Sequence, residues 1–283
     1  MKSSVGRILT ALAFPFTLEF WRTQGVVFSV SSICLIVLWY YLVDKYKAEP
    51  TKMRCVFQYI SSAAMSLICW PVVVDLWVKY FQLGMDMGKW LQYDSFGYYR
   101  LLLNVFLSSL TLDLIFGVIY FRKQMFIMNG WFHHISYIIL TLYLMRWRSY
   151  NIFLIALPEE IPTYFISTYV LFPQDNRSFS RGMFCITFFI FRIAYHITGY
   201  FLLFLPAGNR QTTQLWIPTS LTIFAHCYWY LLWLRKHWRA LLRTEEPPYS
   251  REILGAGRGD LKDKECGCVD YFDHYNSLGH EAQ

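Results

Sequence analysis

The stretch MFIMNGWFHHISYIILTLYLM, residues 125–145, is long and apolar but carries two adjacent histidines, His133 and His134, near its middle. About 21 residues at ~1.5 Å per residue cross the ~30 Å hydrocarbon core of a bilayer. An ionisable side chain at that depth costs several kcal/mol unless it faces a partner or a water-filled cavity. The stretch therefore predicts a transmembrane helix, and it predicts that other helices supply partners for the histidines.

The composition of the whole chain is typical of a membrane protein. Hydrophobic residues make up 55% of it and charged residues 16%, against about 25% charged in an average soluble domain. The mean hydropathy is +0.30. We predict an all-α polytopic membrane protein with about seven transmembrane helices. The predicted spans are residues 26–43, 57–78, 101–120, 125–145, 152–172, 183–205 and 215–234.

The chain divides into three predicted regions. Residues 1–54 hold an interfacial segment and the first span, residues 55–240 form the main membrane domain, and residues 241–283 form a polar, disordered tail. The net charge of +7 is spread over membrane-flanking loops and the tail, so we interpret it as a topology signal and predict no nucleic-acid partner. The positive-inside rule favours a cytosolic C-terminus.

The seven cysteines do not predict a disulfide framework, because most of them lie within or beside the predicted spans. Cys266 and Cys268 in the tail could bind a metal or carry a lipid, and the sequence leaves their role open. It also leaves the oligomeric state open.

Five consecutive predicted spans carry ionisable residues near their midpoints. Lipid cannot solvate such groups, so the helices must enclose them in a common polar interior or cavity. The candidate catalytic residues are His133, His134, Glu160 and Arg192. The candidate substrate-binding residues are Asp113, Glu159, His196 and His226.

The paired histidines cannot both face one atom, because adjacent residues on a helix point about 100° apart. We expect one of them to face the interior and the other to bond to a neighbouring helix. Metal ligands on one helix face are usually four residues apart, so we predict no metal site at this pair. Catalysis and simple hydrogen bonding between helices both stay open as interpretations of His133 and His134.

The fifth predicted span carries Glu159 and Glu160 between two prolines. Two adjacent carboxylates in apolar surroundings should not both be ionised. Arg192 keeps its proton at any physiological pH, so it needs an anionic partner. This partner is either a carboxylate, in an ion pair with Glu160 or Asp113, or the anion of a bound ligand.

Four short fragments occur along the chain in a fixed order. They are Leu112-Asp113-Leu114, His133-His134, Glu160-Ile161-Pro162-Thr163-Tyr164-Phe165 and Phe191-Arg192-Ile193. Their order resembles the TLC-domain family, which includes the ceramide synthases, the translocation-associated membrane protein and a group of smaller TLC-domain proteins. The resemblance covers residues 55–234 and implies a six-helix barrel built from the second to seventh spans, with the first span outside it. It also implies lipid metabolism in the endoplasmic reticulum or another endomembrane.

The chain departs from the ceramide synthases in one respect. Those enzymes carry, after the paired histidines, a His-Asp element and a further Asp before the Glu. The corresponding positions here hold Ile152, Phe153 and Ala156. The smaller TLC-domain proteins are therefore the closer match, and ceramide synthesis itself is not expected.

One function that fits these residues is acyl transfer to a membrane lipid. A histidine beside a carboxylate can activate a hydroxyl or amine, or can accept an acyl group itself. His133 or His134 would be the base or nucleophile, Glu160 would orient it, and Arg192 would stabilise the oxyanion. The donor would be acyl-CoA, the partner a membrane lipid or fatty acyl chain, and no cofactor would be tightly bound.

Two other functions fit the same residues. A non-enzymatic lipid-binding, sensing or trafficking protein that regulates membrane lipid composition would use the polar cluster to recognise a headgroup, and the missing His-Asp element favours it. A proton-coupled transporter would use the histidines and carboxylates as a relay, although no half-helix repeat is visible.

The predicted topology can be tested at a glycosylation sequon. We expect the loop that carries Asn176-Arg177-Ser178 to face the cytosol, so Asn176 should stay unmodified in the native protein. Peptide mass spectrometry with and without glycosidase treatment measures this. A sugar on Asn176 would reverse the predicted orientation.

Overall fold

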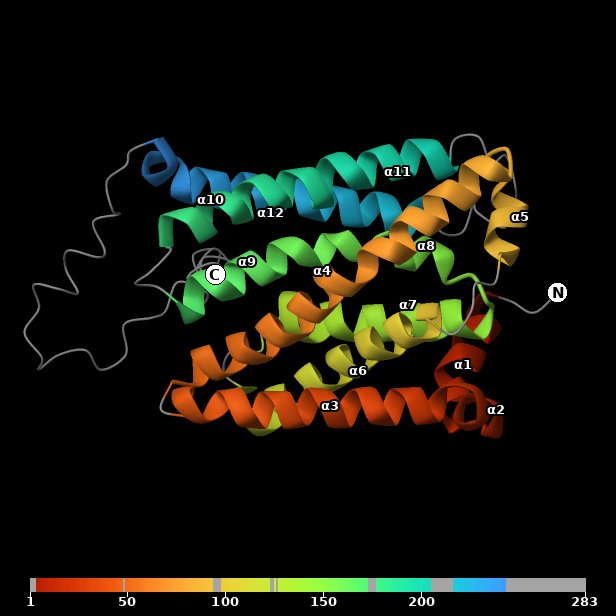
Figure 1. Ribbon diagram of the computed structural model, residues 1–283, viewed down its shortest axis with the longest axis horizontal. Helices are drawn as coiled ribbons and strands as arrows, with labels where there is room; N and C mark the ends of the chain where they lie inside the picture. The colour runs from red at the N-terminus through yellow and green to blue at the C-terminus, as the bar shows by residue number, and fades with distance from the viewer. Residues whose placement is uncertain are drawn as a thin grey trace, which may run out of the picture.

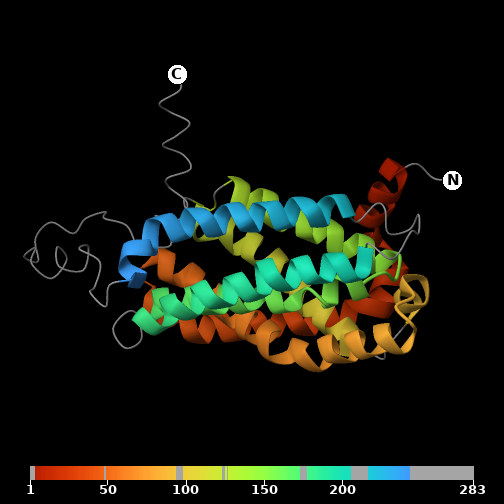
Figure 2. The same ribbon diagram turned by 90° about the horizontal axis from the view of Figure 1, so that it is seen from above.

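The computed structural model describes residues 4–47, 49–93, 98–122, 125, 127–172, 177–204 and 216–242. Over these ranges the secondary structure is helical and contains no strand, which confirms the predicted all-α class. The long helices lie side by side along one direction (Figure 1; Figure 2). The polar tail with Cys266 and Cys268, as well as Asn176, lies outside the described residues.

Helices long and apolar enough to cross a membrane confirm the prediction of a membrane protein. In the described part of the chain there are four, against about seven predicted from the sequence. The fifth predicted span is divided by Pro158 and Pro162, since proline removes a backbone donor and interrupts a helix. The four helical segments are Leu18–Tyr46, Lys52–Gln82, Tyr98–Ile119 and Phe179–Leu203.

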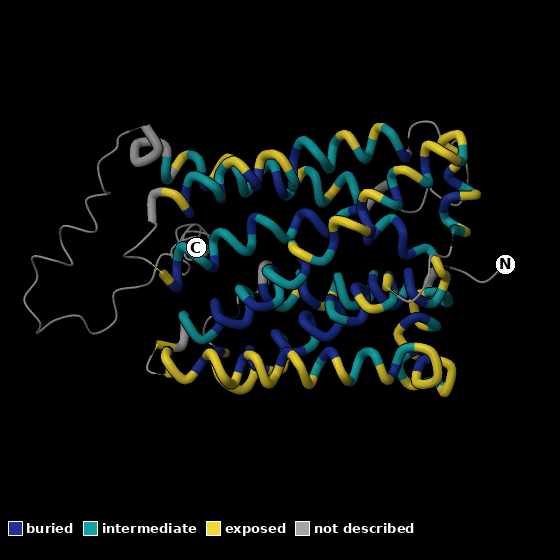
Figure 3. The backbone as a smooth tube through the Cα atoms, viewed as in Figure 1, coloured by how far each residue is buried: buried dark blue, intermediate teal, exposed yellow. Residues whose placement is uncertain are grey.

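The N-terminal helices form one end and one edge of the molecule. Helix α1 packs against α7, and α3 packs against α6 and α4. Much of α3 is exposed (Figure 3), although Leu35, Trp39 and Val43 are buried on one side. The elements are α1 (Ser4–Ala13), η1 (Phe14–Phe16), α2 (Leu18–Phe20), η2 (Trp21–Gly25), α3 (Val26–Val43) and η3 (Asp44–Tyr46).

Helix α4 (Pro50–Gln82) crosses the molecule obliquely (Figure 1) and contacts α3, α6 (Tyr98–Ile119) and α9. Short helix α5 (Met87–Gln92) follows it. Asp86 caps α5, because its carboxylate accepts a hydrogen bond from the Lys89 backbone N–H at 3.1 Å. That bond holds the pKa of Asp86 below its usual range.

The second half of the chain alternates regular helix with tighter or wider turns. Helix α9 packs against α4 and α10, and α12 packs against η7 and α11. Both views place α12 beside α10 and α11 (Figure 1; Figure 2). The elements are η5 (Ile127–Phe132), α7 (His133–Arg146), α8 (Asn151–Leu154), η6 (Leu157–Glu160), α9 (Ile161–Leu171), α10 (Arg177–Thr187), η7 (Phe188–Ala194), α11 (Tyr195–Phe204) and α12 (Trp216–Leu242).

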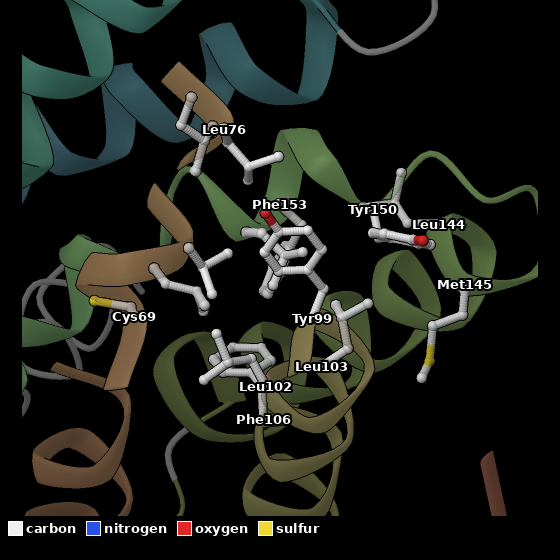
Figure 4. Close-up of a cluster of buried hydrophobic side chains, with 14 of the residues drawn as sticks. Cys69, Leu76, Tyr99, Leu102, Leu103, Phe106, Leu144, Met145, Tyr150 and Phe153 are labelled. Atoms are coloured by element: carbon white, nitrogen blue, oxygen red, sulfur yellow. The ribbon is translucent and has the colours of Figure 1, made fainter. Parts of the chain in front are cut away.

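The main hydrophobic core lies between α4, α6, α7 and α8 (Figure 4). Phe106 and Phe153 pack with ring centroids 4.8 Å apart. Trp90 is fully buried, and its indole N–H donates to the Leu76 carbonyl oxygen at 2.8 Å. This core fixes the position of α8, and therefore of the turn that carries Glu159 and Glu160.

Asn151 holds α8 in place through buried hydrogen bonds. Its Nδ2 donates to the carbonyl oxygens of Trp90 at 2.7 Å and of Tyr93 at 3.1 Å. We expect Asn151→Ala to strand these carbonyls and to lower the free energy of unfolding by about 1–3 kcal/mol. Thermal unfolding in detergent measures the loss. Gln82→Ala, which removes an exposed amide, is the control, and equal melting temperatures for the two variants would contradict the prediction.

Candidate functional site

The first group of buried polar side chains, which we call the Asp113 cluster, consists of Arg54, Asp113 and His134. These residues come from α4, α6 and the first turn of α7. The His134 Nε2 lies 2.8 Å from Asp113 Oδ2, and Arg54 Nη2 lies 4.0 Å from the same oxygen. All three residues are buried, Asp113 with only 3% of its surface exposed. One carboxylate therefore balances two basic groups inside the helix bundle.

Both ring nitrogens of His134 face oxygen atoms. Nδ1 lies 2.6 Å from the Gly130 carbonyl oxygen, one turn earlier, and Nε2 faces the Asp113 carboxylate. His134 therefore acts as a link between α7 and α6.

Arg54 was not among the candidate residues, because it precedes the second predicted span and was counted with the flanking loop charges. In the structure, α4 already begins at Pro50, so Arg54 is helical and 8% exposed. The position of Asp113 inside a predicted span was the feature of the sequence that could have led to Arg54. A buried carboxylate predicts a buried cation, and Arg54 is a basic residue near the start of the adjoining helix.

The second group, which we call the Glu159 cluster, consists of Glu159, His196 and His226 from η6, α11 and α12. The Nδ1 of His196 lies 2.8 Å from Glu159 Oε1. The Nδ1 of His226 lies 3.8 Å from Glu159 Oε2. One potential ligand atom of each residue lies within 4.8 Å of the others. The structure thus brings together three of the four predicted substrate-binding residues, and it places the fourth, Asp113, in the other cluster.

Arg192 lies beside the η6 turn. Its Nε donates to the Glu159 carbonyl oxygen at 2.9 Å, and its Nη2 donates to the Thr163 hydroxyl at 2.7 Å. Thr163, a residue that was not a candidate, also lies close to the Glu160 carboxyl group. Arg192 is thus held by the Glu159 backbone and the Thr163 side chain.

The predicted ion pairs of Arg192 therefore need correction. Among the residues that the structure describes, no carboxylate oxygen lies within 4.0 Å of Arg192, and Asp113 pairs instead with Arg54 and His134. The prediction that Glu160 orients one of the paired histidines also differs from the geometry. His134 has Asp113 as its carboxylate, and the carboxylate of the η6 turn that contacts histidines is Glu159. On the tight 3-10 turn, the side chains of these two adjacent glutamates point in different directions.

His133 and His134 have different neighbours, as their adjacent positions on the helix predict. The His133 ring packs against Tyr137 with centroids 4.6 Å apart, whereas His134 contacts Asp113. Tyr137 lies close to Thr222 on α12. His133 is near enough to Asp113 and to Arg192 to interact electrostatically with both.

His133 also differs from the other histidines of the site in its bonding. Over the described residues, neither of its ring nitrogens has a hydrogen-bond or ion-pair partner, whereas His134, His196 and His226 each lie within 4 Å of a carboxylate. The ring is half-buried. Its nitrogens are therefore available to a bound molecule.

Irregular backbone lies next to several of these residues. The π-helical segment η5 ends at Phe132, immediately before His133, and the π-helical segment η7 contains Arg192 and ends two residues before His196. Single π-helical turns inside α-helices are frequent at functional sites, because they change the direction of the side chains that follow.

Comparison with protein-family models, with curated proteins and with solved structures gives no match.

The Asp113 cluster can be tested by a double-mutant cycle. Asp113→Asn removes the negative charge that faces Arg54 and His134, and breaking a buried ion pair from one side costs about 3–5 kcal/mol. We expect a clear drop in melting temperature, and we expect Arg54→Met in the same chain to recover part of it. Asp44→Asn, at the exposed ion pair with Lys47, should leave the melting temperature unchanged. Strict additivity of the Asp113 and Arg54 effects would rule out a coupled pair.

Proposed function

We propose that this chain is a membrane-embedded protein of lipid metabolism that transfers an acyl group to a membrane lipid, with His133 as the general base or nucleophile. The observation that carries the proposal is the position of His133. It is the histidine of the site whose ring nitrogens have no hydrogen-bond or ion-pair partner among the described residues, while its ring is held against Tyr137. A histidine whose two nitrogens both face protein oxygens, such as His134, has no open nitrogen to accept a proton from a substrate.

Arg192 fits the role of oxyanion stabiliser in this proposal. Two of its donor nitrogens bind Glu159 and Thr163, which fixes the plane of the guanidinium. The Nη1 group has no partner among the described residues and remains available. A fixed cation in a water-poor interior stabilises the negative charge that develops on an acyl carbonyl oxygen far better than a solvated one.

The reaction would proceed from an acyl-CoA thioester. His133 takes the proton from a hydroxyl or amine of the acceptor lipid as this group attacks the thioester carbonyl. Arg192 stabilises the tetrahedral oxyanion, the carbon–sulfur bond breaks, and the CoA thiolate takes the proton back from the imidazolium. The Asp113 cluster and the Glu159 cluster would hold His133 and Arg192 in place.

We further propose that the membrane domain is a TLC-type barrel of six helices within a protein of seven spans. Helix contacts run from α7 to α6, α4, α9 and α10, and from η7 to α12. Tyr137 on α7 lies close to Thr222 on α12, which supports closure of the ring. Helix α3 contacts α4 and α6 and would be the span outside the barrel. Such a protein would reside in the endoplasmic reticulum or another endomembrane, with a cytosolic C-terminus.

Substitutions at the two paired histidines distinguish a catalytic role from a structural one. Asn keeps hydrogen-bonding capacity at a similar volume but neither shuttles a proton near neutral pH nor accepts an acyl group. We expect His133→Asn to keep the wild-type melting temperature but to lose the effect of the protein on cellular lipid composition, measured by untargeted lipid mass spectrometry. His134→Gln should lower the melting temperature, because it breaks a structural link worth about 1–3 kcal/mol.

A second measurement distinguishes a covalent intermediate from simple lipid binding. Intact-mass spectrometry of the purified protein after incubation with acyl-CoA should show an added acyl group on the wild type and none on His133→Asn, if His133 is the nucleophile. A stable His133→Asn variant with full effect on lipid composition would remove the enzyme proposal. Lipid that co-purifies equally with both proteins would then favour the non-enzymatic lipid-binding alternative.

A further inference from the structure

The Glu159 cluster offers the donor atoms of a metal site. Glu159, His196 and His226 come from three separate helical segments, yet one oxygen or nitrogen of each lies within 4.8 Å of the others. Two imidazoles and one carboxylate form a ligand set that is common for catalytic zinc and for other divalent transition metals. Hard cations such as Mg²⁺ and Ca²⁺ prefer oxygen ligands throughout.

The separations between these atoms fit a small tetrahedral ion. With bonds of about 2.1 Å, neighbouring ligand atoms of tetrahedral zinc are about 3.4 Å apart. The two carboxylate–histidine separations, 2.8 Å to His196 and 3.8 Å to His226, lie on either side of that value. The two histidine nitrogens lie within 4.8 Å of each other, so small side-chain movements would bring the three donors to bonding distance.

A second observation points to a ligand in the cluster. The Nδ1 atom of His196 is buried and makes no hydrogen bond, although it lies 2.8 Å from a Glu159 oxygen. The contact is short but misaligned for an N–H···O bond. A buried nitrogen without a hydrogen bond costs free energy, and a cation bonded to both the nitrogen and the carboxylate would remove that cost.

The surroundings hold the donors in place. The Glu159 backbone is held by Arg192, and the Nδ1 of His226 also lies 3.2 Å from the Arg192 carbonyl oxygen. Arg192 is itself held by the Thr163 hydroxyl, to which its Nη2 donates at 2.7 Å. Binding of a metal at the His226 nitrogen would displace its proton, so affinity should rise with pH.

We propose that Glu159, His196 and His226 bind one divalent transition-metal ion of the zinc class. Three protein ligands leave a fourth coordination position for water or a bound molecule, as in catalytic rather than structural zinc sites. The site is separate from His133 and stands whether or not His133 transfers an acyl group. It adds a metal to a part of the chain where the sequence predicts only substrate contacts.

The test measures zinc in the full-length protein, purified in detergent through an affinity tag that contains no histidine. All samples carry Cys266→Ser and Cys268→Ser, so that the cysteines of the tail cannot contribute zinc. After zinc loading and dialysis, mass spectrometry of the metal should find about one ion per chain. Glu159→Gln, His196→Ala and His226→Ala should each reduce this at least tenfold. His237→Ala, on the same helix α12 but outside the cluster, should retain it.

Folding and the separate role of His133 are controlled in the same samples. Size-exclusion profiles show which variants are folded. Glu159→Gln is the mildest of the three changes, because it only replaces one carboxylate oxygen with an NH2 group. If no variant folds, the visible absorption of the parent protein loaded with cobalt(II) tests the site instead. A tetrahedral site gives intense cobalt bands that disappear when zinc displaces the cobalt. His133→Asn should keep the full zinc content. A failure of the acyl-transfer proposal can therefore be distinguished from a failure of the metal-site proposal. Zinc absent from the parent, or unchanged in all three variants, would overturn the metal site.

Discussion

Charged side chains inside a bilayer must be satisfied by other parts of the same protein, and this constraint organises the membrane domain. Asp113, His134 and Arg54 belong to three different helices and meet at one carboxylate oxygen. Glu159, His196 and His226 connect three further segments. Helix packing between apolar surfaces in lipid is weakly specific, because lipid tails are as apolar as leucine. The polar contacts therefore select which helices are neighbours and in which rotation.

The backbone departs from regular α-helix where these contacts are made. The 3-10 turn η6, which contains Pro158 in its first turn, carries both glutamates. A π-helical turn precedes His133, and another contains Arg192. Each irregular turn changes the angle between successive side chains from the ~100° of an α-helix. The rotation is supported from outside by the apolar core around Phe153 and Trp90, which holds α8 rigid. The hydrophobic core and the polar interior thus depend on each other.

The sequence predicts which residues are special but not how they pair. Depth within an apolar segment identifies Asp113 and His226 as buried, and the structure buries both, because any ionisable residue at the midplane must face the interior. The divergence of His133 and His134 also follows from helix geometry alone. The partner of Arg192 does not follow, because pairing depends on the order of helices around the bundle, which no local pattern contains. The sequence also does not predict that Glu159, and not Glu160, contacts histidines, since this depends on the 3-10 turn that carries both residues.

The arrangement gives four histidines three different bonding situations, and chemistry follows from the difference. His134 has acceptors on both nitrogens and cannot exchange a proton without breaking a helix contact. His196 and His226 share one carboxylate and are suited to hold a cation. His133 has a ring packed against Tyr137 but nitrogens that no described residue contacts. Because most buried polar groups in proteins are hydrogen-bonded, a half-buried histidine with open nitrogens is explained by a molecule that binds there in the course of function.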